Sequence, residues 1–157
     1  MCLFALHAHD SPLSGFRIQN GEFRGRRFEL IMRVYIADDQ ARVRDALRLL
    51  LTQEHDLQVV GEADDARLLL REAKKLRPDL ILLDWELPGL SETHPLESLR
   101  KAAPAAKVIA LSGQSDKSAV ALREGAFAFV SKTDPPEVLL AALYSAQKPH
   151  DTNTKPD

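Results

Sequence analysis

Short apolar runs and segments of helical periodicity alternate five times between residues 32 and 147, and this alternation restricts the possible folds most strongly. The apolar runs are largely continuous, which is typical of strands buried on both faces of a parallel sheet. Each parallel connection needs a crossover, and the helical segments supply it. The sequence therefore predicts an α/β fold with a doubly wound, five-stranded parallel sheet in the order 2-1-3-4-5. The predicted strands cover residues 33–38, 57–63, 79–84, 106–112 and 126–132.

The predicted helices follow these strands along the chain. The second helix is expected to stop at Arg77-Pro78, because the residue before a proline disfavours helical backbone. The last helix is expected to have Asp134 as its N-cap and Pro135 at its first position. The first predicted helix ends near residue 54, and the others cover residues 65–76, 96–103, 115–124 and 135–147.

The residues on either side of this central domain, which is expected at 32–147, have no sustained helical or strand period. Residues 1–31 are predicted to form a loosely ordered extension, although Asn20-Gly21 could close a small hairpin. His7 and His9 are interpreted as solvated rather than as a metal pair. Residues 148–157 are predicted to form a disordered polar tail.

The overall composition is that of an ordinary globular protein, with 45% hydrophobic and 28% charged residues. The formal net charge of -2 gives no electrostatic indication of nucleic-acid or anionic membrane binding. Cys2 is the only cysteine, so an internal disulfide is excluded. The sequence contains no apolar run of the roughly 18 residues that a membrane helix needs. We therefore expect a cytoplasmic protein that binds neither nucleic acid directly nor a membrane.

Polar residues stand where four of the predicted strands end. Asp38 and Asp39 end the first strand, Asp84 the third, Ser112 the fourth and Lys132 the fifth. Ligands of open α/β sheets bind outside the carboxyl ends of the strands. In the predicted strand order these side chains would converge in one shallow pocket.

Three close carboxylates repel one another, so either their pKa values rise or a cation binds. A hard cation with oxygen ligands, Mg²⁺ above all, would leave coordination positions open for a phosphoryl oxygen. The carboxylate of Asp84 could then act as a nucleophile toward phosphorus. Lys132 would neutralise charge on the phosphoryl oxygens, and Ser112 would donate a hydrogen bond to one of them. A single acid at a strand end is usually a turn former or helix cap, and it is the coincidence of all these residues that indicates a site.

The motifs IADDQ, LLDWELPG, ALSG and FVSK, in this order, resemble the receiver domain of two-component response regulators. The resemblance spans residues 33 to about 147 and implies the CheY-like, flavodoxin-like version of the fold. It implies that Asp84 is the phosphoacceptor, and that Ser112 and Phe129 are switch residues. It also implies that Lys132 pairs with the phosphate. The implied Mg²⁺ ligands are Asp38, Asp39, Asp84 and the backbone carbonyl of Glu86.

Several positions depart from the commoner pattern of this family. Ser112 stands in place of threonine, which removes a methyl group that restricts the side-chain rotamer. Phe129 has no tyrosine hydroxyl, and Thr133 stands where many receivers have a proline. Glu86 and Gln114 lie at positions that flank the phosphoryl group in this family, so both are candidates for tuning its chemistry.

The resemblance implies a signalling switch rather than a metabolic enzyme. A histidine kinase or phosphotransfer protein would donate a phosphoryl group to Asp84. The response would alter the face of the fourth helix, fifth strand and fifth helix. With no output domain in the sequence, this face is expected to bind a downstream protein or a second copy of the chain. Candidate face residues, although most are expected in the core, are Ala119, Leu122, Ala141, Ala142 and Tyr144.

Two alternative functions remain open from the sequence. A Mg²⁺-dependent phosphatase or phosphotransferase could also use Asp84 as an aspartyl nucleophile, with Glu86 at the spacing of a general acid. The chain has no insertion large enough for the cap that such enzymes usually carry. A receiver-like docking module that is never phosphorylated is the other alternative. Degenerate receivers generally lose an acid or the lysine, and both are present here.

Overall fold

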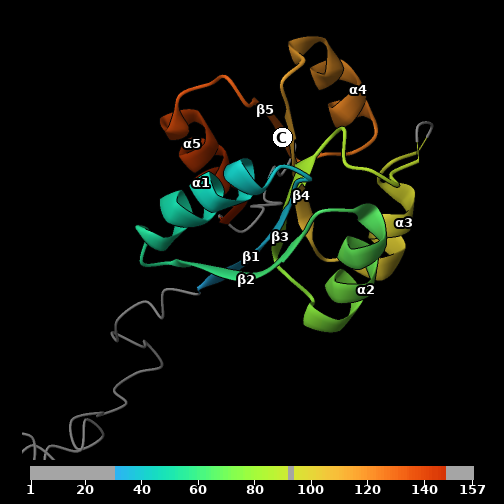
Figure 1. The fold of residues 1–157 in the computed structure, drawn as a ribbon, viewed down its shortest axis with the longest axis horizontal. Helices are drawn as coiled ribbons and strands as arrows, with labels where there is room; N and C mark the ends of the chain where they lie inside the picture. The colour runs from blue at the N-terminus through green and yellow to red at the C-terminus, as the bar shows by residue number, and fades with distance from the viewer. Residues whose placement is uncertain (1–30, 92–93, 148–157) are drawn as a thin grey trace, which may run out of the picture.

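A computed structural model describes residues 31–91 and 94–147, which form one parallel sheet of five strands covered by helices on both faces (Figure 1). The strand order is β2-β1-β3-β4-β5, which confirms the predicted topology. A doubly wound sheet of this order places β1, β3 and β4 side by side at its centre. The strands are β1 (Met32–Ala37), β2 (Leu57–Ala63), β3 (Leu80–Asp84), β4 (Lys107–Ser112) and β5 (Ala128–Ser131).

Two apolar cores lie on opposite faces of the sheet. Successive side chains of a strand point to opposite faces, so Leu82 of β3 faces one core and Leu83 faces the other. Helices α1 (Ala41–Thr52) and α5 (Pro136–Gln147) cover the first core. The second core is covered by α2 (Ala66–Leu76), α3 (Glu97–Ala102) and α4 (Ser118–Arg123). Figure 1 shows this separation, with α1 and α5 on one side of the strands and α2, α3 and α4 on the other.

Most predicted elements agree with the structure to within one or two residues, but the start of the fourth helix and the N-cap of the fifth differ. The helix predicted at 115–124 is divided into a 3₁₀ turn, η1 (Ser115–Lys117), and α4. The predicted N-cap of α5 is wrong. The Asp134 carboxylate accepts a hydrogen bond from the Ser131 N–H at 3.0 Å, and the helix begins one residue later than predicted, at Pro136. The hairpin predicted at Asn20-Gly21 lies outside the described residues.

The pairing of β1 with β2 is irregular at one point. The pairing register shifts between Val34 and Tyr35, so that Tyr35 pairs with Gly61. The Tyr35 ring lies so close to Gly61 that a Cβ atom there would be 2.5 Å from the ring carbon Cε2. The Tyr35 hydroxyl donates a hydrogen bond to Glu72 of α2 at 2.6 Å. A residue without a side chain is therefore needed beside this buried ring.

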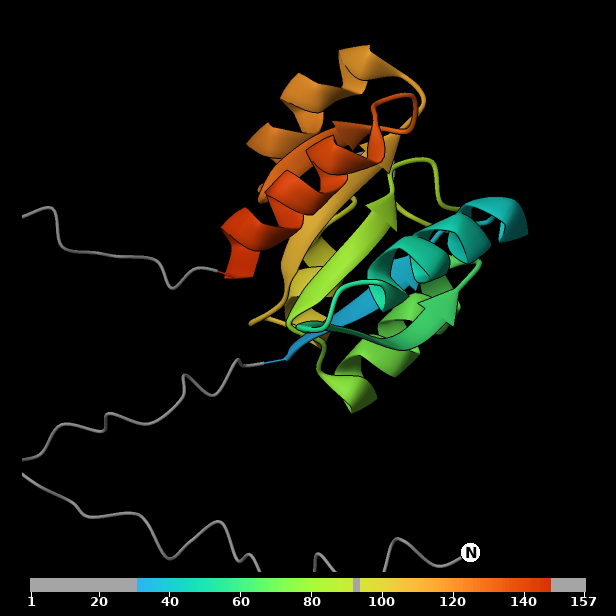
Figure 2. The same ribbon diagram turned by 90° about the vertical axis from the view of Figure 1, so that its left-hand side faces the viewer.

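The described chain enters and leaves the domain at the amino ends of the strands. The Met32 N–H donates to the carbonyl of Asp56, just before β2. Near the end of α5, the carbonyl of Ala146 accepts a 2.6 Å hydrogen bond from Lys107 Nζ, at the first residue of β4. Figure 2 shows the first residue of β1 and the last turn of α5 at the same end of the sheet. In the described part of the chain, no helix has both the length and the apolar character needed to cross a membrane.

Candidate functional site

The carboxyl ends of β1, β3, β4 and β5 bring together the side chains that the sequence singles out. Asp38 directly follows β1, and Asp84 is the last residue of β3. On the next strand, Leu111 pairs with Asp84, and Ser112 pairs with Ser131, the neighbour of Lys132. A parallel sheet aligns these ends at one edge, so the local sequence of each strand is enough to position its polar residue.

Asp38, Asp84 and Lys132 form a buried charge cluster. The two carboxylic acids are 0% and 1% exposed, respectively. The Lys132 ammonium nitrogen lies 2.7 Å from Asp38 Oδ2 and 3.3 Å from Asp84 Oδ1. Within the described residues, Asp38 Oδ2 has no partner with hydrogen-bond geometry, so its contact with Lys132 is an ion pair only. Such a buried carboxylate oxygen is costly unless a further positive charge reaches it.

Burial has opposite effects on the acid and the base of this cluster. Burial raises the pKa of Asp84 to about 6, and the neighbouring charge of Asp38 adds to the rise. The Glu86 N–H and the Lys132 ammonium oppose this shift. Burial alone would lower the pKa of Lys132, but its contacts with Asp38 and Asp84 outweigh that effect and raise it. Lys132 therefore stays charged at neutral pH, whereas Asp84 holds its negative charge at a free-energy cost.

The acidic residues of the cluster have the composition of a site for a hard divalent cation. Asp38, Asp39 and Asp84 each offer a carboxylate oxygen, and these oxygens all lie within 4.8 Å of one another. Asp39 is exposed, so the group is open to solvent on that side. Within the described residues, Asp38 Oδ2 has the ion pair with Lys132 but no hydrogen-bond partner, and an added cation would stabilise both this oxygen and the ionised form of Asp84. The residues present therefore fit Mg²⁺, which prefers carboxylate oxygens and retained waters.

Backbone amides fix the orientation of both buried acids. The Gln40 N–H donates to Asp38 Oδ1 at 2.9 Å, and the Glu86 N–H donates to Asp84 Oδ1 at 3.0 Å. Both are bonds from the residue two positions later, the arrangement of an Asx turn. The Arg44 guanidinium, from α1, also donates to the carbonyl of Asp38 at 2.7 Å. These contacts hold the carboxylates at the strand ends, while Asp38 Oδ2 faces the Lys132 ammonium.

The Ser112 hydroxyl has a partner that the sequence does not predict. It donates a 2.5 Å hydrogen bond to Glu86 Oε1, while its oxygen accepts from the Gln114 N–H at 2.9 Å. Ser112 is fully buried, whereas Glu86 and Gln114 are exposed. Gln114 thus contacts Ser112 through its backbone N–H. The sequence predicts that the ends of β3 and β4 lie close together, but no pattern in it predicts the hydrogen bond between Ser112 and Glu86.

The remaining predicted positions differ in how far they are buried. Phe129 is half-buried and packs against the core beneath α2, α3 and α4. A Cβ atom at Gly113 would meet nothing within 4 Å, so the surroundings of Ser112 are open on that side. The expectation that most candidate face residues belong to the core is wrong. Only Ala142 is half-buried, and the exposed residues are Ala119, Leu122, Ala141 and Tyr144.

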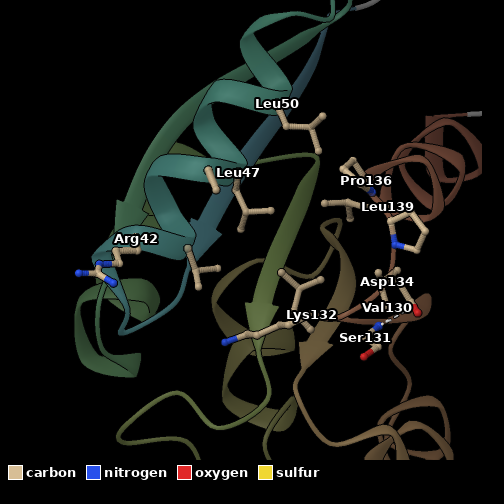
Figure 3. A pocket seen from close by; sticks show the side chains of 13 residues that line it. Arg42, Leu47, Leu50, Val130, Ser131, Lys132, Asp134, Pro136 and Leu139 are labelled. Atoms are coloured by element: carbon tan, nitrogen blue, oxygen red, sulfur yellow. Dashed lines mark hydrogen bonds between the residues drawn. The ribbon is translucent and has the colours of Figure 1, made fainter.

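A cavity of about 340 Å³ lies beside the acidic cluster, between α1 and the start of α5. Figure 3 shows Leu50 of α1 pointing across it toward Pro136 and Leu139, with Arg42 at one end. Lys132 lines the cavity and also reaches the acidic cluster. No pattern in the sequence predicts this cavity, because it depends on how two helices distant in the chain pack together.

Comparison with known proteins gives consistent matches over this region. Residues 34–144 match the family model of the response regulator receiver domain. The nitrate/nitrite response regulator protein NarL of Escherichia coli is 32% identical over 115 residues, which cover 72% of this chain and 53% of that protein. The uncharacterized transcriptional regulatory protein YxjL of Bacillus subtilis is 32% identical over 119 residues, covering 74% of this chain and 55% of the relative. The chain thus spans about half the length of these curated relatives.

Solved structures show the same architecture. The response regulator domain of Thermotoga maritima CheB has a TM-score of 0.64 and 28% identity, and the match covers 76% of this chain and 98% of that one. RcsB of Salmonella enterica serovar Typhimurium, bound to the promoter rprA in the presence of the phosphomimetic BeF₃⁻, has a TM-score of 0.68 and 27% identity. That match covers 75% of this chain and 61% of RcsB.

Proposed function

Because this chain belongs to the response regulator receiver family, we propose that it is a switch that accepts a phosphoryl group on Asp84. The observation that carries the proposal is the burial of Asp84 beside Asp38 and within 3.3 Å of the Lys132 ammonium. Burial favours the protonated form of this carboxyl group, whereas the Lys132 ammonium favours its ionised form. The Glu86 N–H orients the carboxylate. These are the requirements of an oxygen nucleophile directed at phosphorus.

In the proposed step, a carboxylate oxygen of Asp84 attacks the phosphorus of a phosphohistidine. The new O–P bond forms as the P–N bond breaks, and the imidazole leaves with the electron pair of that bond and takes up a proton. Lys132 stabilises negative charge on the phosphoryl oxygens, and Ser112 donates a hydrogen bond to one of them. When bound by Asp38, Asp39, Asp84 and the Glu86 carbonyl, Mg²⁺ would neutralise part of the phosphoryl charge.

The proposed donor is a histidine kinase or a phosphotransfer protein in the cytoplasm. The proposed output is a change in the face of α4, β5 and α5, in which Ser112 and Phe129 move together, so that it binds a downstream protein or a second copy of the chain. A phosphoryl group can shift this equilibrium only through contacts that differ between the two states. In this proposal the domain is a phosphoacceptor and not a metabolic enzyme, and it does not itself contact DNA. The DNA-bound RcsB relative is a longer protein than this chain.

The test uses Trp85, the only tryptophan, which is half-buried next to Asp84. Its fluorescence is followed during a Mg²⁺ titration, and acetyl phosphate is then added before an intact mass is taken. We expect a saturable metal response and one added phosphoryl group, with Asp84→Asn as the unlabelled control. Rapid turnover of a simple phosphomonoester would instead support the phosphatase alternative. Absence of both the metal response and the label would leave the docking module.

A further inference from the structure

We propose that the Glu86 carboxylate positions the switch hydroxyl: it holds Ser112 in the resting state and must release it before Ser112 can contact a phosphoryl group on Asp84. The inference rests on the proposed function and adds a means of regulation to it. Its starting point is the 2.5 Å hydrogen bond from Ser112 Oγ to Glu86 Oε1. This bond joins the fourth strand to the segment that follows the third, directly beside the proposed phosphoacceptor.

The hydroxyl of Ser112 has only one proton to donate. In the structure that proton is used by Glu86, and the oxygen is already an acceptor for the Gln114 N–H at 2.9 Å. Ser112 is 0% exposed, so water does not readily replace either partner. The hydrogen bond to Glu86 and a hydrogen bond to a phosphoryl oxygen therefore exclude each other.

The geometry allows Glu86 to leave without disturbing the rest of the site. Its backbone N–H is held by Asp84 Oδ1 at 3.0 Å, while its side chain is exposed. Release therefore needs a rotation of the Glu86 side chain and no movement of the strand. Ser112 lacks the β-methyl group of threonine, so its own side chain can also turn with less restriction.

A phosphoryl group on Asp84 would favour this release by charge repulsion. The Glu86 carboxylate lies close to Asp84, because it accepts a hydrogen bond from Ser112, whose neighbour Leu111 pairs with Asp84. A phosphoryl group adds further negative charge at that position, and like charges disfavour one another at short range. The phosphoryl oxygen then replaces the carboxylate as the acceptor for Ser112. The strength of the hydrogen bond to Glu86 thus determines how readily the Ser112 hydroxyl exchanges this acceptor for a phosphoryl oxygen.

A double-mutant cycle tests this proposal with beryllofluoride as the phosphoryl analogue. Its dissociation constant is measured by Trp85 fluorescence in saturating Mg²⁺ for wild type, Glu86→Ala, Ser112→Ala and the double variant. Glu86→Ala removes a charge-assisted hydrogen bond of the resting state. When Ser112 is present, this substitution should therefore lower the dissociation constant about tenfold relative to wild type. In the Ser112→Ala background there is no hydroxyl to release, so only the effect of removing a negative charge remains. We therefore expect a coupling of about tenfold between the two substitutions.

Two further variants separate hydrogen bonding from charge. Glu86→Gln keeps an oxygen acceptor without the charge and should give an intermediate affinity. Asp116→Ala removes an exposed acid of η1 and should have the same effect in both Ser112 backgrounds. If Ser112→Ala does not fold, Ser112→Cys takes its place, because a thiol is a weak donor.

The outcomes distinguish this inference from the function on which it rests. If wild type binds beryllofluoride and is labelled on Asp84, but the effects of Glu86→Ala agree within about twofold in both backgrounds, the positioning role is wrong and the switch remains. If wild type neither binds the analogue nor accepts a phosphoryl group, both proposals fail. A coupling of about tenfold with labelling of wild type supports both.

Discussion

At the scale of single residues, the ionised carboxylate of Asp84 should destabilise the metal-free protein at neutral pH. Burial raises its pKa to about 6 from a reference of 3.8, so the folded state binds the proton more tightly than the unfolded state. The resulting stabilisation is present below about pH 4 and is lost as the pH rises through about 6. We expect Asp84→Asn to raise the free energy of unfolding at pH 7.5 by about 1–3 kcal/mol.

Urea unfolding in EDTA at pH 7.5 and pH 5 measures this effect. The difference between wild type and Asp84→Asn should be smaller at pH 5, where wild-type Asp84 is mostly protonated in the folded state. Asp116→Asn, at an exposed position, serves as the control and should change stability little at either pH. An Asp84→Asn variant that is less stable than wild type at pH 7.5 would contradict the prediction.

Tyr35 is a second residue whose buried hydroxyl should contribute to stability. Its hydroxyl donates to Glu72 at 2.6 Å, and Tyr35→Phe would leave that partly buried carboxylate without this donor. We expect a loss of about 1–2 kcal/mol in urea unfolding at pH 7. Tyr144→Phe is the matched control, because Tyr144 also donates to a carboxylate, that of Glu54, but is 37% exposed. Equal losses for the two variants would show that burial does not matter here.

The same residue gives a prediction for alkaline solution. Burial, followed by the hydrogen bond to Glu72, raises the pKa of Tyr35 in the folded state. A tyrosine in the unfolded chain ionises near pH 10, so the stabilisation is complete below that pH and declines as the pH rises above it. Unfolding at pH 9 and pH 11 should therefore show a steeper loss for wild type than for Tyr35→Phe. If wild type and Tyr35→Phe lose the same amount of unfolding free energy between pH 9 and pH 11, the prediction is wrong.

The position of a site residue could be predicted from the sequence where it depends only on the strand that carries the residue. Asp84 and Ser112 end their strands, and Asp38 and Lys132 directly follow theirs, so the predicted topology alone brings the four together. The hydrogen bonds from Tyr35 to Glu72 and from Ser112 to Glu86 join separate segments and depend on side-chain rotamers. Sequence periodicity carries no information on rotamers, and this is why both contacts were missed.

At the scale of elements, the irregular pairing of β1 with β2 makes Gly61 a position where adding one methyl group should lower stability. A Cβ atom at Gly61 would lie 2.5 Å from the Tyr35 ring, which is buried and fixed by Glu72. Overpacking of this kind costs about 1–3 kcal/mol, so Gly61→Ala should lower the unfolding free energy by that amount. Gly113→Ala is the control, since a Cβ atom there would meet nothing within 4 Å. Thermal or urea unfolding that ranks the two variants equally would overturn the prediction.

The starts of α4 and α5 could not be predicted from apolar spacing, for a physical reason. The predicted bounds of β2 agree with the structure, although only its first and last residues are buried. The start of α5 depended on which of two turns Asp134 would serve, and its carboxylate bonds back to Ser131. The division between η1 and α4 likewise depends on local backbone hydrogen bonds and not on apolar spacing.

At the scale of the whole molecule, a cation at the acidic cluster should stabilise the fold by mass action. Asp38, Asp39 and Asp84 are brought within reach of one ion only by folding, so the unfolded chain should bind it more weakly. At a Mg²⁺ concentration 100 times the dissociation constant, the gain would be about 2.7 kcal/mol. Melting temperatures should rise with Mg²⁺ and return on adding EDTA. The Asp38→Asn, Asp84→Asn double variant should show no such rise, and an equal rise would place the ion elsewhere.

The hydrogen bond from Lys107 to Ala146 places the end of α5 beside the amino end of β4, at the same end of the sheet as the start of β1. The acidic cluster occupies the other end, so the length of the sheet separates it from both points where the described chain is continued. A fluorescent protein or an affinity tag fused beyond either point would therefore lie away from the cluster and from the proposed phosphoryl donor. The domain can be immobilised, labelled or fused in tandem through these points, with the acidic cluster at the opposite end of the sheet from the attachment.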